Sequence, residues 1–184
     1  FLKHFLIGEF SGNTDTYWSV YQYKKRGEDK IYTGPVWDFD IAFDNDYRTY
    51  PLNNKADFVC FSGGSVAGDM GTFVHRIILQ DANTLPQIRE LWMQAKHHGI
   101  TEDALCTWID DMANTIDRSQ RLNFMRWDIL NRQEHMNPIA RGSFENEVNY
   151  LKEYITKRIQ WLDKRLQCTA TDIVHDLVST HQVA

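Results

Sequence analysis

The chain has 184 residues, of which 42% are hydrophobic and 24% are charged, and its formal net charge is −5. A chain of this length can bury a core as one domain, and this composition is typical of globular proteins. The negative balance argues against a nucleic-acid partner. The sequence contains no apolar run of about 18 residues, so it predicts no membrane span.

The three cysteines, Cys60, Cys106 and Cys168, lie far apart in the sequence. Their spacing is not that of zinc ligands, so we expect reduced thiols and no zinc site. The chain starts at Phe1, in the middle of an apolar pattern and without a Met. The sequence therefore predicts a fragment of a longer protein, in which a missing targeting segment has little meaning.

The first part of the chain predicts a helix, a loop and a β-hairpin. Apolar residues recur at helical spacing over residues 2–10, and Ser11-Gly12-Asn13 ends that pattern. Residues 17–23 alternate with a period of two and are rich in strand-forming side chains. The charged stretch 24–30 then predicts a turn, and residues 31–33 predict the returning strand.

The rest of the chain predicts a long loop followed by helices. The irregular stretch 46–65 is longer than most connections in compact domains, and long loops of this kind are often functional. Beyond it the apolar spacing is helical, with helix caps predicted at Thr84, Thr101 and Ser143. The predicted helices cover residues 73–81, 85–98, 102–116 and 144–167. Residues 119–130 predict a helix or irregular packing, and residues 169–184 predict a tail or linker. The fold class is α+β, mainly α.

Asp15 lies two residues after Asn13, in the loop between the first helix and the first strand. One interpretation is a turn aspartate that accepts hydrogen bonds from nearby amides, as most loop Asp residues do. The other interpretation is catalytic, with the carboxylate orienting a hydroxyl or lying near metal-bound phosphates. Both interpretations stay open on the sequence alone.

Asp38 and Asp40 flank Phe39 on a segment that we expect to be extended, directly after the hairpin. We expect only one of the two carboxylates to face a given site. The next residues, Asp44-Asn45-Asp46, add oxygen atoms of the type that magnesium and calcium prefer. The alternative is a polar loop, with or without a structural calcium ion.

Several other catalytic motifs are missing from the sequence. The seven histidines lack partners at zinc spacing, and no G-x-S-x-G stretch supports a serine hydrolase. The stretch Ser62-Gly63-Gly64-Ser65 lacks the lysine of a Walker-type phosphate loop. The candidate chemistry therefore lies in the first fifty residues.

Two stretches in that region together resemble the spore-coat CotH kinase family. The first is EFSGNTDTY at residues 9–17, and the second is GPVWDFDIAF at residues 34–43. The order of loop, hairpin and aspartate pair is that of a protein-kinase catalytic loop, hairpin and metal-binding aspartate. The resemblance covers residues 9–45 and implies a protein-kinase-like C-terminal lobe over residues 1–168, with a short β-hairpin and several packed helices.

Position by position, the resemblance implies that Asp15 is the catalytic aspartate, which orients the acceptor hydroxyl. It implies that Asp38 binds magnesium, with Asp40 at a further metal-side position. Asn13 and Ser19 stand at positions that it assigns to cofactor binding.

The sequence departs from ordinary kinases at two points. Val20 stands where those kinases carry a second metal-binding Asn, and Asp44-Asn45 stands where Gly is common. A kinase also needs an N-terminal lobe whose loop covers the phosphates and whose lysine pairs with a glutamate. Nothing before Phe1 supplies that lobe, so we expect this chain alone to bind ATP poorly and to be inactive.

The resemblance implies an atypical protein kinase that transfers phosphate from ATP to Ser/Thr hydroxyls of a protein, with magnesium or another divalent cation. It also implies a cell-surface or secreted location. One alternative is a non-catalytic surface or scaffold module that binds a protein or a divalent cation. A second alternative is the transfer of another group from a nucleotide.

Overall fold

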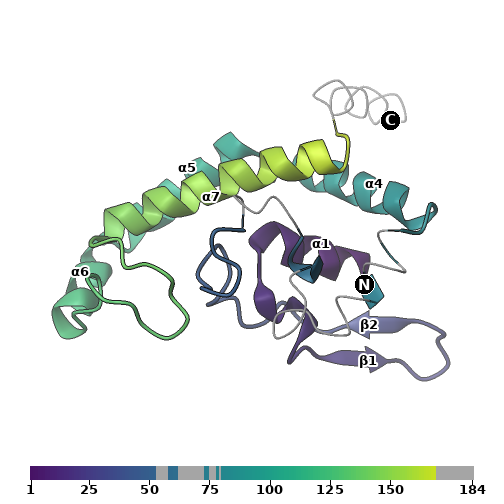
Figure 1. Ribbon diagram of the computed structural model, residues 1–184, viewed down its shortest axis with the longest axis horizontal. Coiled ribbons are helices and arrows are strands. Elements are labelled where there is room, and N and C mark those ends of the chain that lie inside the picture. Colours follow the sequence, from purple (N-terminus) through teal and green to yellow (C-terminus); the bar gives the residue numbers. More distant parts are fainter. Residues whose placement is uncertain (53–57, 62–72, 75–77, 79, 169–184) are drawn as a thin grey trace. The chain divides into compact units, whose positions relative to one another are not determined.

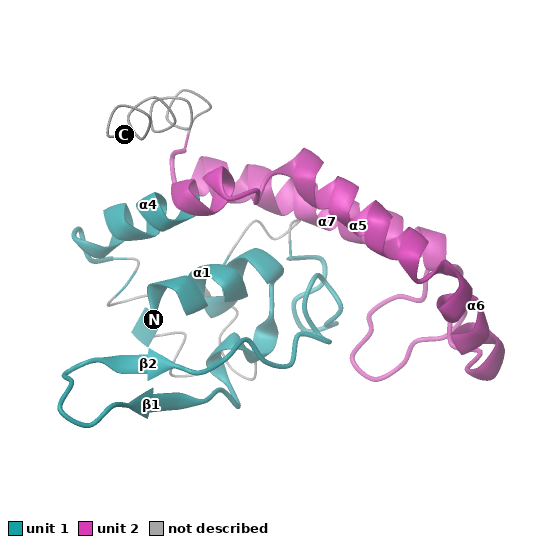
Figure 2. Ribbon diagram, turned by 180° about the vertical axis from the view of Figure 1, so that it is seen from behind, with its two compact units in different colours: residues 1–92 teal, residues 93–184 magenta. Residues whose placement is uncertain are grey.

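The computed structural model describes residues 1–52, 58–61, 73–74, 78 and 80–168 (Figure 1). The chain divides into two compact units, Phe1–Trp92 and Met93–Ala184 (Figure 2). All residues that the sequence singled out for chemistry belong to the first unit. The second unit, where it is described, is helical.

Helix α1 (Leu2–Ser11) confirms the predicted N-terminal helix. Gly12 ends it in the left-handed conformation, with φ 65°, and donates its N–H to the carbonyl oxygen of Gly8. Gly8 is needed for a second reason. A Cβ atom at that position would lie 2.2 Å from the side chain of Thr16, so glycine allows the following loop to pack against α1.

The next segment is the 3₁₀ helix η1 (Thr14–Tyr17), not the start of a strand. Asn13 caps it, because its side-chain oxygen accepts a hydrogen bond from the Asp15 amide at 3.1 Å. Ser19 then adopts a left-handed backbone conformation, with φ 51°. The predicted strand over 17–23 is therefore wrong for most of its length, since the cap and the left-handed turn interrupt the extended chain.

The hairpin consists of β1 (Gln22–Lys24) and β2 (Ile31–Thr33), which pair in antiparallel orientation. The returning strand agrees with the prediction. After β2, the N–H of Gly34 donates to the carbonyl oxygen of Tyr21 at 2.5 Å. A Cβ atom on Gly34 would lie 2.7 Å from the Tyr21 side chain, so glycine permits this close approach.

A buried carboxylate, Glu9 of α1, holds the first unit together. It is 0% exposed and accepts hydrogen bonds from the Tyr17 hydroxyl and from the amides of Val59 and Cys60. Val59 and Cys60 begin the 3₁₀ helix η2 (Val59–Phe61). A buried charge needs such partners, so Glu9 fixes both η1 and η2 against α1. The apolar core of this unit includes Phe5, Leu52, Phe58, Val74, Ile88 and Trp92.

Helix α4 (Thr84–His97) begins one residue earlier than predicted, so Thr84 is its first residue and not the residue that caps it. The Thr84 hydroxyl donates to the Asp81 carboxylate at 2.5 Å, so Asp81 stabilises this end of the helix. Ile88 and Trp92 are buried, as the apolar stripe predicted. The predicted helix over 73–81 lies largely outside the described residues.

The second unit contains α5 (Glu102–Thr115), α6 (Asp117–Arg126) and α7 (Phe144–Arg165). Both predicted caps are confirmed, because the side-chain oxygens of Thr101 and Ser143 accept hydrogen bonds from the first turns of α5 and α7. Helices α5 and α7 lie side by side in both views (Figures 1 and 2).

The apolar stripe predicted for α5 is only partly buried. Ile109 is 7% exposed, but Trp108 is 60% exposed and Met112 is 43% exposed. For residues 119–130 the sequence left a helix and irregular packing open, and the structure has helix α6 there, which ends at Arg126. These are differences in boundary and burial, not in the type of element.

The mainly helical α+β class is confirmed, since the described elements are helices and one two-stranded antiparallel sheet. No helix within the described ranges has the length and apolar character that a membrane crossing requires. The cysteines Cys60, Cys106 and Cys168 are in the reduced form in the structure.

Candidate functional site

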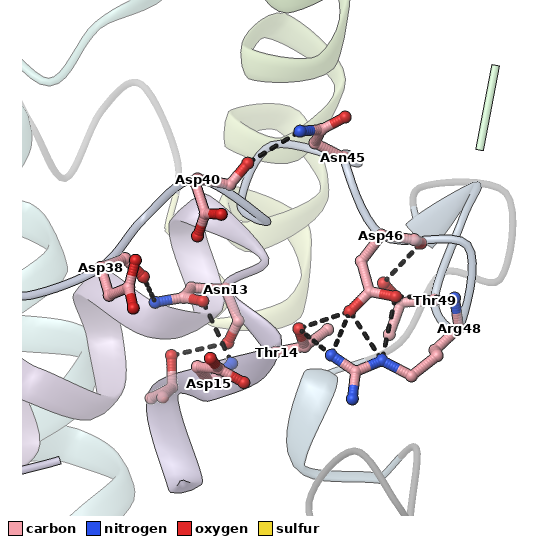
Figure 3. A network of polar contacts seen from close by, with 10 residues as sticks. Asn13, Thr14, Asp15, Asp38, Asp40, Asn45, Asp46, Arg48 and Thr49 are labelled. Carbon is pink, nitrogen blue, oxygen red and sulfur yellow. Dashed lines mark hydrogen bonds and ion pairs between the residues drawn. The ribbon is translucent and has the colours of Figure 1, made fainter. Parts of the chain in front are cut away.

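The candidate site begins in the loop between α1 and η1. Asn13 is 2% exposed, and Asp15 is half-buried in the first turn of η1. Besides capping η1, the Asn13 side chain donates from Nδ2 to the backbone carbonyl oxygen of Asp38 at 3.4 Å (Figure 3). Asn13 therefore joins the loop of Asp15 to a segment 25 residues further along the chain.

Backbone anchors hold the aspartate segment against the end of α1. The N–H of Phe43 donates to the carbonyl oxygen of Ser11 at 2.6 Å. Ile41 and Ala42 are 5% and 2% exposed, so they fix the segment from the apolar side. The sequence folds this way because two buried apolar residues follow directly after the two aspartates.

Asp38 adopts a left-handed backbone conformation, with φ 55°. For a residue with a Cβ atom this conformation costs roughly 1–2 kcal/mol, and residues under such strain cluster at functional sites. Asp40 follows at the start of a turn, and both residues are exposed. The prediction of an extended segment is therefore wrong.

The carboxylates of the site influence one another. Burial raises the pKa of Asp15, the positive charge of Arg48 lowers it, and the charges of Asp38, Asp40 and Asp46 raise it, so the pKa lies above its usual value. Figure 3 shows the side chains of Asp38 and Asp40 on the same side of their segment as the loop of Asp15. The sequence predicted that only one of the pair would face the site, whereas both do (Figure 3).

A second cluster lies beside Asp15 and consists of Thr14, Asp46 and Arg48 (Figure 3). The Oδ2 atom of Asp46 accepts from the Thr14 hydroxyl at 2.6 Å and from Nη2 of Arg48 at 2.6 Å. Burial would raise the pKa of Asp46, but the hydrogen bonds from Arg48 and Thr14 lower it below its usual value overall. Asp46 is thus held as a carboxylate.

The sequence predicted Asp44, Asn45 and Asp46 as additional oxygen ligands. In the structure Asp44 is 4% exposed and accepts from the Leu52 amide at 2.8 Å. The Asn45 side chain donates to the carbonyl oxygen of Asp40 at 2.7 Å, and the Asp46 carboxylate accepts from Thr14 and Arg48. These side chains stabilise the loop, so the structure does not support the prediction that they are open metal ligands.

Sequence reasoning missed Thr14 and Arg48. Thr14 is flanked by the two motif residues but belongs to no motif itself, and Arg48 lies 34 residues away from it in the sequence. No local pattern signals their contact. It becomes visible only when the loop folds back onto η1.

Ser19 and Val20 follow η1. Ser19 is exposed, and Val20 lines a cavity of about 170 Å³ that also adjoins Asn13, Trp37 and Phe39. The Val20 side chain has no ligand atom, so it cannot take the part of the second metal-binding Asn of ordinary kinases. Asp40 is the described carboxylate that stands beside Asp38.

The family model for the CotH kinase protein matches residues 1–162. The chain belongs to the CotH kinase family. Neither a curated protein nor a solved structure matches the chain. The kinase-like C-terminal lobe and its extent to residue 168 therefore stay predictions, and the predicted tail 169–184 lies outside the described residues.

Within the described part of this CotH kinase family member, no group of three or more His, Cys, Asp or Glu side chains is arranged to hold a metal ion. Magnesium that binds with a nucleotide needs fewer protein ligands, because it keeps several waters and uses one or two carboxylates plus phosphate oxygens. Asp38 and Asp40 are two exposed carboxylates. The pair fits a magnesium ion that arrives with a nucleotide better than a calcium ion held by protein ligands alone.

Proposed function

We propose that the protein is an atypical protein kinase that transfers the γ-phosphoryl group of ATP to a Ser/Thr hydroxyl of a protein substrate, with magnesium as cofactor. One observation carries the proposal. Asn13 ties the loop of Asp15 to Asp38, and Asp40 lies near the same point, in a chain of the CotH kinase family. The order of these residues matches that of the catalytic and metal-binding aspartates of kinases.

In this proposal Asp15 orients the acceptor hydroxyl and takes its proton as the oxygen attacks the γ-phosphorus, while the bond from that phosphorus to the bridging oxygen breaks and ADP leaves. The raised pKa of Asp15 suits that role, because a carboxylate with a higher pKa holds a proton more strongly. Its position in a capped helical turn keeps the backbone fixed, so orientation is established before the substrate binds.

Asp38 and Asp40 would hold the magnesium ion, and the ion would supply positive charge that stabilises the transferring phosphoryl group. Asn13 sets the position of Asp38 relative to Asp15, and the exposed Ser19 lies on the nucleotide side. Such a site works by positioning and charge stabilisation. Loss of either Asp15 or Asp38 therefore lowers the rate by orders of magnitude without unfolding the protein.

The test measures Mg-ATP binding by calorimetry and protein phosphorylation by mass spectrometry, on the full-length protein. Asp38→Ala should abolish Mg-ATP binding. Asp15→Asn should still bind Mg-ATP but transfer phosphate at least about 100-fold more slowly, since general-base groups contribute 10² to 10⁴ in rate. Asp29→Ala is the matched control, because it removes the same charge from an exposed position in the hairpin turn and should change neither quantity.

Two results would contradict the proposal. If the wild-type protein ignores ATP but binds a protein or calcium, the chain is a scaffold module. If the modified substrate gains a mass other than about 80 Da, another group is transferred.

Family membership also supports a cell-surface or secreted location for the protein. Digestion of intact cells with an added protease tests this part of the proposal. A protein that is degraded only after the cells are lysed would contradict it.

A further inference from the structure

Arg48 contacts both Asp46 in its own loop and Thr14 in η1. Its Nε donates to the Asp46 carboxylate at 3.0 Å and 2.9 Å, and its Nη2 donates to Asp46 at 2.6 Å and to the Thr14 hydroxyl oxygen at 3.1 Å. The Thr14 hydroxyl in turn donates to Asp46 at 2.6 Å. The three side chains form a closed ring of hydrogen bonds, and Thr14 directly precedes Asp15 (Figure 3).

The ring is well enclosed. Thr14 and Asp46 are each 0% exposed, and the Arg48 side chain is 21% exposed. Two-point hydrogen bonds between a guanidinium and a carboxylate are stronger and more directional than neutral ones, and enclosure reduces their screening by salt. Thr14 cannot shift without breaking two of these bonds, so the ring restrains the backbone on which Asp15 stands.

Arg48 also acts on Asp15 through its charge. The positive guanidinium lowers the pKa of Asp15, against the raising effects of burial and of Asp38, Asp40 and Asp46. Without the positive charge of Arg48, the repulsion between Asp15 and the other carboxylates of the site would raise the pKa of Asp15 further. Arg48 therefore supports both the position of Asp15 and its ionised form.

We propose that Arg48 is a positioning residue for phosphoryl transfer: it acts through Thr14 to hold Asp15 opposite the acceptor hydroxyl, and Asp46 holds Arg48 in place. The inference rests on the proposed kinase function. Nε and Nη2 already bind Asp46 and Thr14, and this geometry favours a role through the loop over direct binding of a phosphate.

The experiment compares kcat, KM for ATP, Mg-ATP affinity and unfolding temperature in full-length variants. Arg48→Gln removes the charge and Thr14→Val removes the hydroxyl at nearly constant shape. Each should lower kcat by about 100-fold while the Mg-ATP Kd changes less than about threefold, because misplacement of a reacting group affects the transition state and not ground-state binding. Arg48→Lys keeps the charge but should have a kcat close to that of Arg48→Gln, since an ammonium group cannot form the two-point hydrogen bond with a carboxylate.

The double variant Thr14→Val/Arg48→Gln should be no slower than the slower single variant, because both changes break one ring. The matched control is Arg121→Gln, which breaks an exposed ion pair with Asp117 in α6 and should leave kcat unchanged. An unchanged kcat in Arg48→Gln overturns the proposal. Equal losses in kcat and Mg-ATP affinity overturn it as well, because Arg48 would then be a phosphate ligand.

A second measurement does not depend on catalysis. Amide hydrogen exchange at Asp15 and Thr16 should accelerate in Arg48→Gln and Thr14→Val but not in Arg121→Gln, since the N–H groups of both residues bond to Asn13 in the restrained loop. If the wild-type protein transfers no phosphate, the proposed function is refuted. The exchange measurement would still decide whether Arg48 restrains the loop. Unchanged exchange would refute the restraint itself.

Discussion

The side-chain amide of Asn13 donates a hydrogen bond to the backbone carbonyl oxygen of Asp38 at 3.4 Å, and its oxygen accepts from the Asp15 amide at 3.1 Å. One neutral side chain thus sets the spacing between the proposed base and the proposed metal ligand. Its two bonds serve different purposes. The first connects two loops, and the second caps a helical turn.

Substitution of Asn13 should separate these purposes. Asn13→Ala loses both bonds and should lower the free energy of unfolding by about 1–2 kcal/mol. Asn13→Ser keeps an oxygen that can cap η1 but cannot reach Asp38, so it should lose less stability and still lose transfer activity. Urea unfolding and phosphate transfer by both variants test this. Wild-type activity in Asn13→Ser would show that the bond to Asp38 is dispensable.

Gly8→Ala should destabilise the protein by about 1–3 kcal/mol, because the added methyl group overlaps the Thr16 side chain. The double variant Gly8→Ala/Thr16→Gly should show a favourable interaction energy, since the overlap is then removed. Lys3→Ala on the same helix is the control and should change stability by less than about 0.5 kcal/mol. Strictly additive effects in a thermal or urea unfolding cycle would refute the clash.

Glu9→Gln should lower the free energy of unfolding by about 2–3 kcal/mol. The hydrogen bonds to a charged group are lost, and the NH₂ group of the new side chain faces a buried donor that the carboxylate had accepted from. The amides of Val59 and Cys60 are such donors. Glu153→Gln on α7 is the matched control, since that residue forms an exposed ion pair worth little. Equal urea midpoints for the two variants would contradict the role assigned to Glu9.

The stability of Asp15→Asn should depend on pH with a defined sign. Burial, together with Asp38, Asp40 and Asp46 and against Arg48, raises the pKa of Asp15 in the folded protein. Well below about pH 4 the Asp15 carboxyl is protonated in both the folded and the unfolded protein, so its ionisation does not lower the free energy of unfolding of wild type. As the pH rises through the raised folded pKa, wild type loses stability that the amide variant keeps.

Asp15→Asn should therefore be more stable than wild type near neutral pH, and the difference should vanish in acid. Asp46→Asn is the opposite case, because the pKa of Asp46 is lowered in the folded protein. Its carboxylate stabilises wild type at neutral pH, and that contribution disappears as the pH falls through the lowered pKa. Unfolding temperatures measured from acid to neutral pH test both signs, and identical profiles for the two variants would refute the assignment.

The sequence singled out the candidate site residues where the signal was local. Asp15, Asp38 and Asp40 stood out because acidic residues followed a helix end and a hairpin. The caps Thr101 and Ser143 were predicted correctly because such a bond spans only three residues. Features that depend only on residues close together in the sequence can therefore be predicted from short stretches of it.

Other features depend on contacts that no short stretch contains. The alternation over 17–23 is a genuine strand pattern, but the Asn13 cap and the left-handed Ser19 override it. Arg48 meets Thr14 across 34 residues, so periodicity and motifs give no indication of it. The exposure of Trp108 was likewise not visible from its place in a helical stripe.

The three cysteine thiols give this chain natural chemical probes. Cys60 is buried in the first unit, Cys168 is buried just after α7 in the second, and Cys106 is half-exposed on α5. A buried thiol reacts with a disulfide reagent only when the structure around it opens, whereas an accessible one reacts at once. A nucleotide that slows labelling of Cys60 but not of Cys168 would thus report, without any engineered tag, that it stabilises the unit that contains Asp15.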